Sequence, residues 1–287
     1  MAERSSHEPA WRRFAHRRLA MAGVIVLGLL VAASFLGPWL ARYRYDTLTA
    51  ELSSPPSLRH WFGTDAIGHD TLAQVLRGAR RSLLVALLVA TVSTVVGAVI
   101  GTLAGYYRGL VDLALMRITD LFLAIPALAV LLVVASRFRG QAGNWVALSL
   151  VIAGFAWMPL ARIVRSVVLS LREQEFVEAA RAMGASDARI IARHLLPNSL
   201  GVIVVNATLA VALAILVETA LSFLGFGIAP PDTSLGRLVA DGASASRTRW
   251  WLFYLPGLYL VLISLSVNVV GDGLRDAFDP ARRRRSP

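Results

Sequence analysis

The sequence predicts an all-α polytopic membrane protein with six transmembrane helices. Its 287 residues are 56% hydrophobic and only 16% charged, whereas a soluble domain carries roughly 25% charged residues. The apolar residues gather in long runs, and a membrane helix needs about 20 such residues to cross the hydrocarbon layer. Backbone groups in lipid must be satisfied within their own segment, so these runs favour helices. The alternating pattern of a transmembrane β-barrel is missing.

The predicted spans follow one another along the chain. The run 118–136 contains a single charged residue, Asp120, and is interrupted by Pro126. Pro159 and Pro256 lie in two other runs, so each proline is expected to kink or break its helix. Five runs contain no charge, namely 19–40, 82–107, 140–161, 195–217 and 250–271.

The first run, 19–40, follows a basic stretch and could be taken for a signal peptide. Its apolar part is longer than the roughly 7–15 residues of a signal core, so we interpret it as a retained first span. The sequence then divides into a basic N-terminus 1–18, this span, an external loop 41–81, a core of five spans 82–280 and a basic tail 281–287.

Arginine predicts the orientation, because the chain has 29 arginines and no lysine. Eighteen of them lie on the side that holds both termini, and eleven lie on the other side. The positive-inside rule places the more basic side in the cytoplasm, although the loop 41–81 alone holds six arginines. The net charge of +11 indicates contact with anionic lipid head groups. Nucleic-acid binding is disfavoured, because the arginines are dispersed rather than gathered on one face.

A polar segment, "EFVEAARAMGASDARIIARHLLPN", lies between two apolar runs. Its first part has apolar residues at one helical spacing, and Gly184 follows where a left-handed residue ends a helix at low cost. Its second part is expected to be another helix that Pro197 stops at the next membrane entry. The first stripe consists of Phe176, Ala179, Ala180 and Met183, and the second helix presents Ile190, Ile191, His194 and Leu195.

The residues alone leave three roles open for this predicted cytoplasmic hairpin, 173–198. It could be a solvated surface loop, a DNA-binding helix–turn–helix, or a coupling element that docks on another protein. The DNA-binding role is disfavoured, because both ends enter the bilayer and leave little freedom to approach a groove. A narrow stripe of small side chains favours close packing against a partner over exposure to solvent.

The same segment resembles the EAA loop of ABC importer permeases. The residues that match the pattern of that loop are Glu178, Ala179, Ala180, Gly184, Leu196 and Pro197. His194 stands where the broad pattern has an isoleucine, and a histidine there is similar to the dipeptide, oligopeptide and nickel branch of the superfamily. The resemblance therefore points to one branch of the family.

Other stretches between about residues 61 and 280 resemble that branch in the same order. "HWFGTDAIGHDTLAQVLRGARRSLLV" is similar to its external signature, with His69 in place of the usual arginine. The signature residues are Gly63, Thr64, Asp65, Gly68 and Asp70. The further matching stretches are "LAGYYRGLVDLALMRITDLFLAIP", "LVETALSFLGFGIAPPDTSLG", in which Leu235 replaces a tryptophan, and "NVVGDGLRDAFDP".

The resemblance implies a type I ABC importer permease fold in a bacterial inner membrane, with both termini in the cytoplasm. The implied partners are a homologous second permease, two ATP-binding subunits that hold ATP and Mg, and an extracytoplasmic solute-binding protein. The solute would be a peptide or a related small solute such as nickel. The residues implied in ATPase coupling are Glu178, Ala179, Ala180, Met183, Gly184, Ile190, His194 and Pro197.

The chain is not predicted to be an enzyme. A P-loop requires a lysine that reaches the phosphates, and the sequence has none. The five histidines show no zinc-site spacing, although a metal site that uses His60 and His69 with nearby aspartates stays an alternative to structural roles. We expect no cofactor on this chain, so ATP hydrolysis would belong to partner subunits.

Three residues are candidates for the translocation path or its gate. Glu218 lies in the fifth span, where an ionisable group is costly and usually faces a pore, a cavity or a partner. Gate and structural hydrogen bond both stay open for Glu218. Asn206 and Ser222 complete the candidate set, although asparagine commonly joins helices in membranes. The segment 224–236 is rich in Gly and Pro and is expected to form a re-entrant or capping element near the mouth of the path.

A secondary transporter or a membrane scaffold without ATP dependence is the alternative function. Secondary transporters often contain internal repeats and ion sites near the bilayer midplane. The sequence shows no repeat, and only Glu218 is clearly placed as a charge within a span. Both observations favour the importer.

Overall fold

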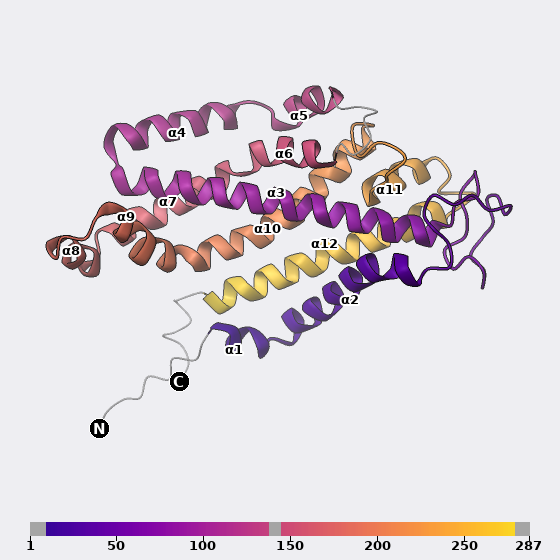
Figure 1. Ribbon diagram of the computed structural model, residues 1–287, viewed down its shortest axis with the longest axis horizontal. Helices are drawn as coiled ribbons and strands as arrows, with labels where there is room; N and C mark the ends of the chain where they lie inside the picture. The colour runs from indigo at the N-terminus through magenta and orange to yellow at the C-terminus, as the bar shows by residue number, and fades with distance from the viewer. Residues whose placement is uncertain (1–9, 138–144, 279–287) are drawn as a thin grey trace.

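The computed structural model describes residues 10–137 and 145–278. In this part of the chain the regular elements are helices, joined by loops that carry two isolated β-bridges. Figure 1 shows an elongated bundle with a short helical hairpin at one end and a long irregular loop at the other. We call these the hairpin end, on the left of Figure 1, and the loop end, on the right.

Four helical stretches are long and apolar enough to cross a membrane. Two pairs of helices pass this test only together, because each pair is bent, by 78° at Ile125–Pro126 and by 42° at Trp157. The six predicted spans are therefore present when each bent pair counts as one. The long helices are α2 (Arg18–Leu40), α3 (Thr71–Tyr107), α10 (Leu196–Phe223) and α12 (Trp251–Phe278), and the pairs are α4 (Gly109–Ala124) with α5 (Ala127–Ser136) and α6 (Trp145–Ala156) with α7 (Met158–Arg172).

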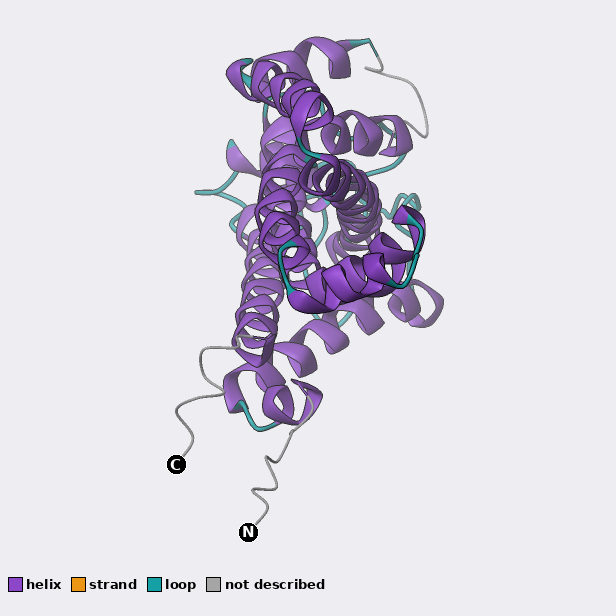
Figure 2. Ribbon diagram, turned by 90° about the vertical axis from the view of Figure 1, so that its left-hand side faces the viewer, coloured by secondary structure: helices purple, strands orange, loops and turns teal. Residues whose placement is uncertain are grey.

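The remaining helices are short, and three of them lie at the two ends. The hairpin end holds α8 (Glu175–Ala182) and α9 (Asp187–Ile190), and the loop end holds α11 (Leu235–Ala243). Helix α1 (Ala10–Ala15) precedes α2 and contacts α12. Figure 2 is viewed from the hairpin end and shows the hairpin in front of the bundle helices. The start of α2 and the end of α12 lie at the hairpin end, away from the long loop (Figure 1).

The prolines act as expected at two of three positions. Pro126 precedes α5 and Pro159 lies in the first turn of α7, so both mark the bends between paired helices. At the third position the helix is not broken, because α12 continues through Pro256. Since Pro256 has no N–H, it leaves the carbonyl of Leu252 without its helical donor. That carbonyl packs against Gly242, where a Cβ atom would clash with it.

Helix α3 lies at the centre of the bundle and contacts α2, α4, α6, α7, α10 and α11. It begins at Thr71, inside the predicted external loop 41–81, because the side chain of Asp70 accepts a hydrogen bond from Ala73 N at 2.8 Å and caps the helix. The apolar run that begins at Ser82 marks only the later part of this helix. The charged first turns of α3 therefore belong to the helix and not to the loop.

A ladder of glycines brings α3 and α7 into close contact. Gly97, Gly101 and Gly105 are spaced four residues apart on one side of α3. A Cβ atom at Gly97 would lie 2.7 Å from the carbonyl oxygen of Trp157, directly before α7, and one at Gly105 would lie 2.8 Å from that of Arg165. One at Gly101 would also clash with α7. Small residues at this spacing let two membrane helices approach at the backbone. The backbones of α3 and α7 therefore pack closely against each other.

The second arm of the hairpin runs directly into the next long helix. A π-helical turn, η1 (Ile191–Leu195), joins α9 to α10, so residues 187–223 form one continuous helical stretch. The prediction that Pro197 stops the helix is therefore wrong. Leu196 N donates to the carbonyl of Ile191 in the wider π pattern, and the helical stretch continues through Pro197, which has no N–H to donate.

Candidate functional site

The turn of the hairpin is built as predicted. Gly184 has φ +79°, a left-handed conformation that costs glycine little. Ala185 N donates to the carbonyl of Ala180 at 3.0 Å, and Gly184 N donates to that of Arg181 at 2.9 Å, which is the Schellman pattern of a helix end. A Cβ at Gly184 would meet open space. The conformation, and not crowding, therefore requires glycine here.

The hairpin has a buried face and an exposed face, and the predicted stripe mixes the two. Ala180 is buried beside Val177 and does not lie on the surface with Met183. Ile190 is likewise buried, so Ala180 and Ile190 support the hairpin from within this chain, which corrects their place as docking contacts. The apolar cluster that holds these residues includes Leu160, Val164, Val168, Leu195 and Ile203 of the bundle.

Five of the other residues predicted to couple are exposed. Glu178, Ala179 and Gly184 are exposed, and Met183 has 81% of its surface accessible. Pro197 is also exposed, at the start of α10. This face combines an acidic group, a small residue and a flexible apolar side chain, a surface that can receive a partner closely.

His194 closes the base of the hairpin. Its half-buried ring lies 6.1 Å from the ring of Phe176, centroid to centroid, so the second arm meets the first. The carbonyl of His194 accepts a hydrogen bond from Asn198 Nδ2 at 2.6 Å. His194 therefore joins the two arms, and its contacts do not form the exposed face.

Two residues missed by the sequence reasoning attach the hairpin to the bundle. The hydroxyl of Tyr106, at the end of α3, donates to Asp187 Oδ1 at 2.6 Å. Arg172, the last residue of α7, donates to the carbonyl of Tyr106. These pairs are 81 and 66 residues apart in sequence, so no local pattern announces them.

Glu218 and Ser222 lie together in a buried polar network near the loop end. Glu218 is fully buried and accepts hydrogen bonds from Ser82 Oγ at 3.1 Å and from Ser222 Oγ at 2.7 Å. Ser222 also lies 3.3 Å from the hydroxyl of Ser234, which caps α11. The network therefore joins α3, α10 and α11, and Glu218 lines no surface of the described chain.

Asn206 is separate from that network. It lies three helical turns before Glu218 on α10, and its side-chain Nδ2 donates to the carbonyl of Val202 in the same helix at 2.8 Å. The structure brings Glu218 and Ser222 together and leaves Asn206 apart from them.

The external signature forms a compact turn at the loop end. Asp65 Oδ1 accepts from the backbone N of Ile67 and of His69, and its other oxygen lies 2.8 Å from His69 Nδ1. Gly63 and Gly68 have φ +72° and +95°. Thr64 N donates to the carbonyl of Ser54, and Ser54 N donates to Thr64 Oγ1, both at 2.9 Å. These residues give the loop its shape.

The two histidines of the loop have different carboxylate partners. His60 is buried, stacks on Tyr43 at 4.5 Å and lies 2.7 Å from Asp70 Oδ2, whereas His69 pairs with Asp65. The described residues contain no group of three metal-ligating side chains. The geometry of His60 and His69 is that of two structural pairs.

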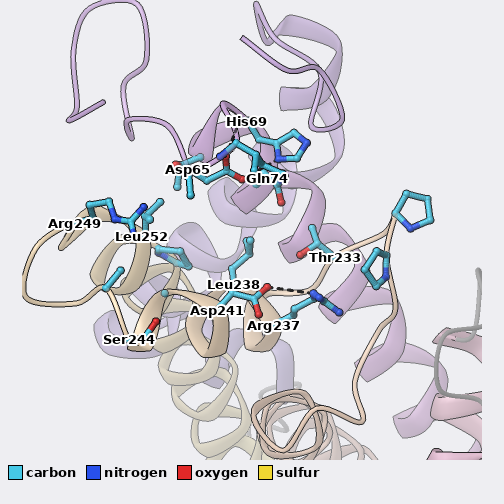
Figure 3. A pocket seen from close by; sticks show the side chains of 18 of the residues that line it. Asp65, His69, Gln74, Thr233, Arg237, Leu238, Asp241, Ser244, Arg249 and Leu252 are labelled. Atoms are coloured by element: carbon cyan, nitrogen blue, oxygen red, sulfur yellow. Dashed lines mark hydrogen bonds and ion pairs between the residues drawn. The ribbon is translucent and has the colours of Figure 1, made fainter. Parts of the chain in front are cut away.

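A cavity of about 430 Å³ opens between the external loop and α11. Figure 3 shows Asp65, His69 and Gln74 on one side of it and Leu238 and Asp241 on the other. The irregular segment before α11 forms a further wall. Asp232 of this segment is held by two arginines of α3, with Arg77 Nε at 2.8 Å from Oδ1 and Arg81 on the other oxygen. The predicted cap is therefore fixed to the start of α3.

The comparison with known families decides the identity of this bundle. Residues 97–284 match the family described as the binding-protein-dependent transport system inner membrane component, over more than half of the chain. The chain belongs to this family. Residues 8–56 of the permease also match the N-terminal TM domain of oligopeptide transport permease C. The family resemblance predicted from the sequence is confirmed.

Individual relatives match the permease along nearly its whole length. The oligopeptide transport system permease protein OppC of Mycobacterium tuberculosis is 46% identical and covers 95% of this chain and 94% of its own. That of Escherichia coli K12 is 43% identical, with 98% and 93% covered. The dipeptide transport system permease protein DppC of Bacillus subtilis is 39% identical, with 96% and 86% covered.

A solved structure shares the fold. A chain of the inward-facing MetNI methionine ABC transporter superimposes with a TM-score of 0.58 and 21% identity, over 72% of this chain and 97% of that chain. The fold is therefore that of a type I ABC importer permease, as predicted. The chain is a multi-pass membrane permease subunit of an ATP-binding-cassette importer.

Proposed function

We propose that this permease forms the translocation path of a peptide importer together with a second, related permease. The substrate class is supported by the relatives, which are named as oligopeptide and dipeptide permeases at 39–46% identity over 95% or more of this chain. A related small solute such as nickel is the alternative substrate within the same branch. The loop end would receive an extracytoplasmic solute-binding protein, and the described cavity lies on that face.

The hairpin is the proposed contact with two ATP-hydrolysing subunits, and the observation that carries this role is its position. Its exposed face presents Glu178, Ala179 and Met183. One arm continues from α7 after Arg172, and the other continues without interruption into α10. A movement imposed on this face therefore reaches two membrane helices through the chain itself. ATP and Mg would be held by the partners, since the sequence has no lysine for a P-loop.

The proposed orientation places the hairpin and both termini in the cytoplasm. Three of the six arginines that argue against it, Arg77, Arg80 and Arg81, lie on α3 and have partners within the protein. Arg77 and Arg81 pair with Asp232, and the Arg80 guanidinium lies 5.2 Å from the ring of Phe35.

The test is reconstitution of the permease with its partner permease, the ATPase subunits and the binding protein. Glu178→Arg and Gly184→Pro should abolish ATP-dependent peptide uptake into proteoliposomes while the permease remains in the membrane. Glu51→Arg is the control, because it makes the same charge reversal at the loop end, where Glu51 pairs with Arg59. It should leave the attachment of the ATPase subunits unchanged. Two results would contradict the proposed coupling and favour a secondary transporter. One is uptake that continues without ATP, and the other is normal uptake by both hairpin variants.

A further inference from the structure

One tyrosine connects the hairpin to the central helix. Tyr106 is the penultimate residue of α3, and only 5% of it is exposed. Its hydroxyl donates to the carboxylate of Asp187, the first residue of α9, at 2.6 Å. A hydrogen bond to a charged group is stronger than one between neutral groups. The bond thus fixes the second arm of the hairpin to a helix with which it shares no covalent link nearby.

Two arginines complete this attachment. Arg172 donates to the carbonyl of Tyr106, one of the carbonyls at a helix end that no following turn can satisfy. The guanidinium groups of Arg172 and Arg181 lie 5.9 and 5.5 Å from the centre of the Tyr106 ring, within the range of cation–π interaction. Arg181 belongs to α8 and Asp187 to α9. Both arms of the hairpin therefore meet the same tyrosine.

The other end of α3 is attached to the cap at the loop end. Arg77 and Arg81 hold Asp232, and Ser82 Oγ accepts a hydrogen bond from Leu235 N at 3.2 Å. The helix has 37 residues and is about 55 Å long at about 1.5 Å per residue. One straight element thus connects the proposed ATPase contact to the proposed face of the binding protein.

We propose that Tyr106 is a positioning residue for transport, which transmits movement of the hairpin to α3 through its hydrogen bond to Asp187. The inference rests on the coupling function proposed above. The hairpin moves α7 and α10 through the backbone, and the Tyr106 hydroxyl adds a direct bond from Asp187 of the second arm to the end of α3. The glycine ladder then keeps α7 beside α3. Loss of the hydroxyl leaves ATP hydrolysis in place and reduces the movement that reaches the cap.

The test compares four variants in the complete reconstituted transporter. Tyr106→Phe and Asp187→Ala should each lower the peptide imported per ATP hydrolysed by about fivefold, the value of one net hydrogen bond. The double variant should be no worse than either single one. Asp187→Asn keeps an acceptor oxygen and should retain most of the ratio. Tyr107→Phe is the matched control, because the Tyr107 ring stands edge-on to Tyr106 and is 48% exposed.

A second measurement reports on the attachment without transport. The chain has no cysteine, so Met183→Cys on the hairpin and Val99→Cys on α3, both exposed, give two unique sites for spin labels. The distance distribution between them should broaden in Tyr106→Phe and stay narrow in Tyr107→Phe.

The outcomes separate this inference from the proposed function. An unchanged import ratio and an unchanged distance distribution in Tyr106→Phe would overturn the positioning role, while import by the native complex would leave the proposed function intact. A lower import ratio in Tyr106→Phe that comes with a fall in melting temperature and a loss of bound ATPase subunits would show that the residue is merely structural. This result would also overturn the positioning role. Absence of ATP-driven import by the native complex would instead refute the proposed function.

Discussion

The loop end and the hairpin end of this permease are stabilised by opposite kinds of contact. At the loop end, charged and polar groups are buried and paired, as His60 is with Asp70 and Glu218 is with two serines. At the hairpin end, the buried side chains are mainly aliphatic, such as Val177 and Ile190, and the charged groups lie mostly on the surface. The two ends therefore differ in the free energy that a small displacement of their helices requires.

Buried polar networks have directional bonds, and a displaced member leaves a donor or acceptor without a partner. Aliphatic contacts have no preferred direction, so a helix can shift by a small amount and remain packed. The loop end is thus suited to hold helices in one arrangement, and the hairpin end is suited to move with a partner. Tyr106 is an exception at the hairpin end, since its bond to Asp187 is directional.

A pair of glycines gives the strongest test of this difference. Gly63 and Gly184 both have positive φ, +72° and +79°. A Cβ at Gly63 would lie 2.6 Å from the carbonyl oxygen of Ser54 and 2.9 Å from the ring of Trp251, whereas one at Gly184 would meet nothing within 4 Å. Gly63→Ala should therefore cost about 3–5 kcal/mol of strain and overpacking. Gly184→Ala should cost only about 1–2 kcal/mol for the left-handed conformation.

The measurement is thermal unfolding of the purified permease in detergent micelles, with both variants prepared in the same way. We expect a large fall in melting temperature or loss of folded protein for Gly63→Ala and a small fall for Gly184→Ala. Equal effects would show that the loop end is no more constrained than the hairpin.

The next effect concerns the ion pairs that hold the cap. Asp232→Ala should cost about 3 kcal/mol, because it leaves Arg77 and Arg81 partly buried without their common carboxylate. Asp46→Ala is the control, since the Asp46–Arg44 pair is largely exposed and should contribute little to stability. Melting temperatures with and without 0.5–1 M salt, where exposed pairs are screened, distinguish the two. A cap that unfolds no earlier in Asp232→Ala than in Asp46→Ala would contradict a rigid loop end.

Much of the fold could be predicted from sequence, because the signals for it are local. Apolar runs indicate spans, and Gly184 indicates the turn of the hairpin, since few other residues adopt its backbone conformation at low cost. The start of α3 at Thr71 was missed because the charged turns after it carry no apolar run. An N-cap residue such as Asp70, after a loop that contains glycines, is the signal that could have located the start of α3.

The candidate site was predicted less well, because its contacts join distant parts of the chain. The stripe through Ala180 and Met183 follows helical spacing, but the bundle buries Val177 with Ala180 and leaves Met183 outside. A Val–Ala pair three residues apart fits helical spacing equally well, so periodicity alone could not decide between the two faces. The contact between Tyr106 and Asp187 depends on how α3 and α9 meet, which no sequence window contains.

The smallest expected effect concerns Glu218 and decides whether the loop end only holds helices together. Gln keeps one acceptor oxygen and the shape of the side chain, so Glu218→Gln should preserve most of the hydrogen bonding with Ser82 and Ser222 and cost about 1 kcal/mol or less. We expect unchanged peptide uptake and unchanged stimulation of ATPase activity. Glu218→Ala, which leaves both serines without their carboxylate acceptor, should lower the melting temperature. If Glu218→Gln instead stopped uptake at a normal melting temperature, its charge would serve as a gate, and the network at the loop end would have a role beyond structure.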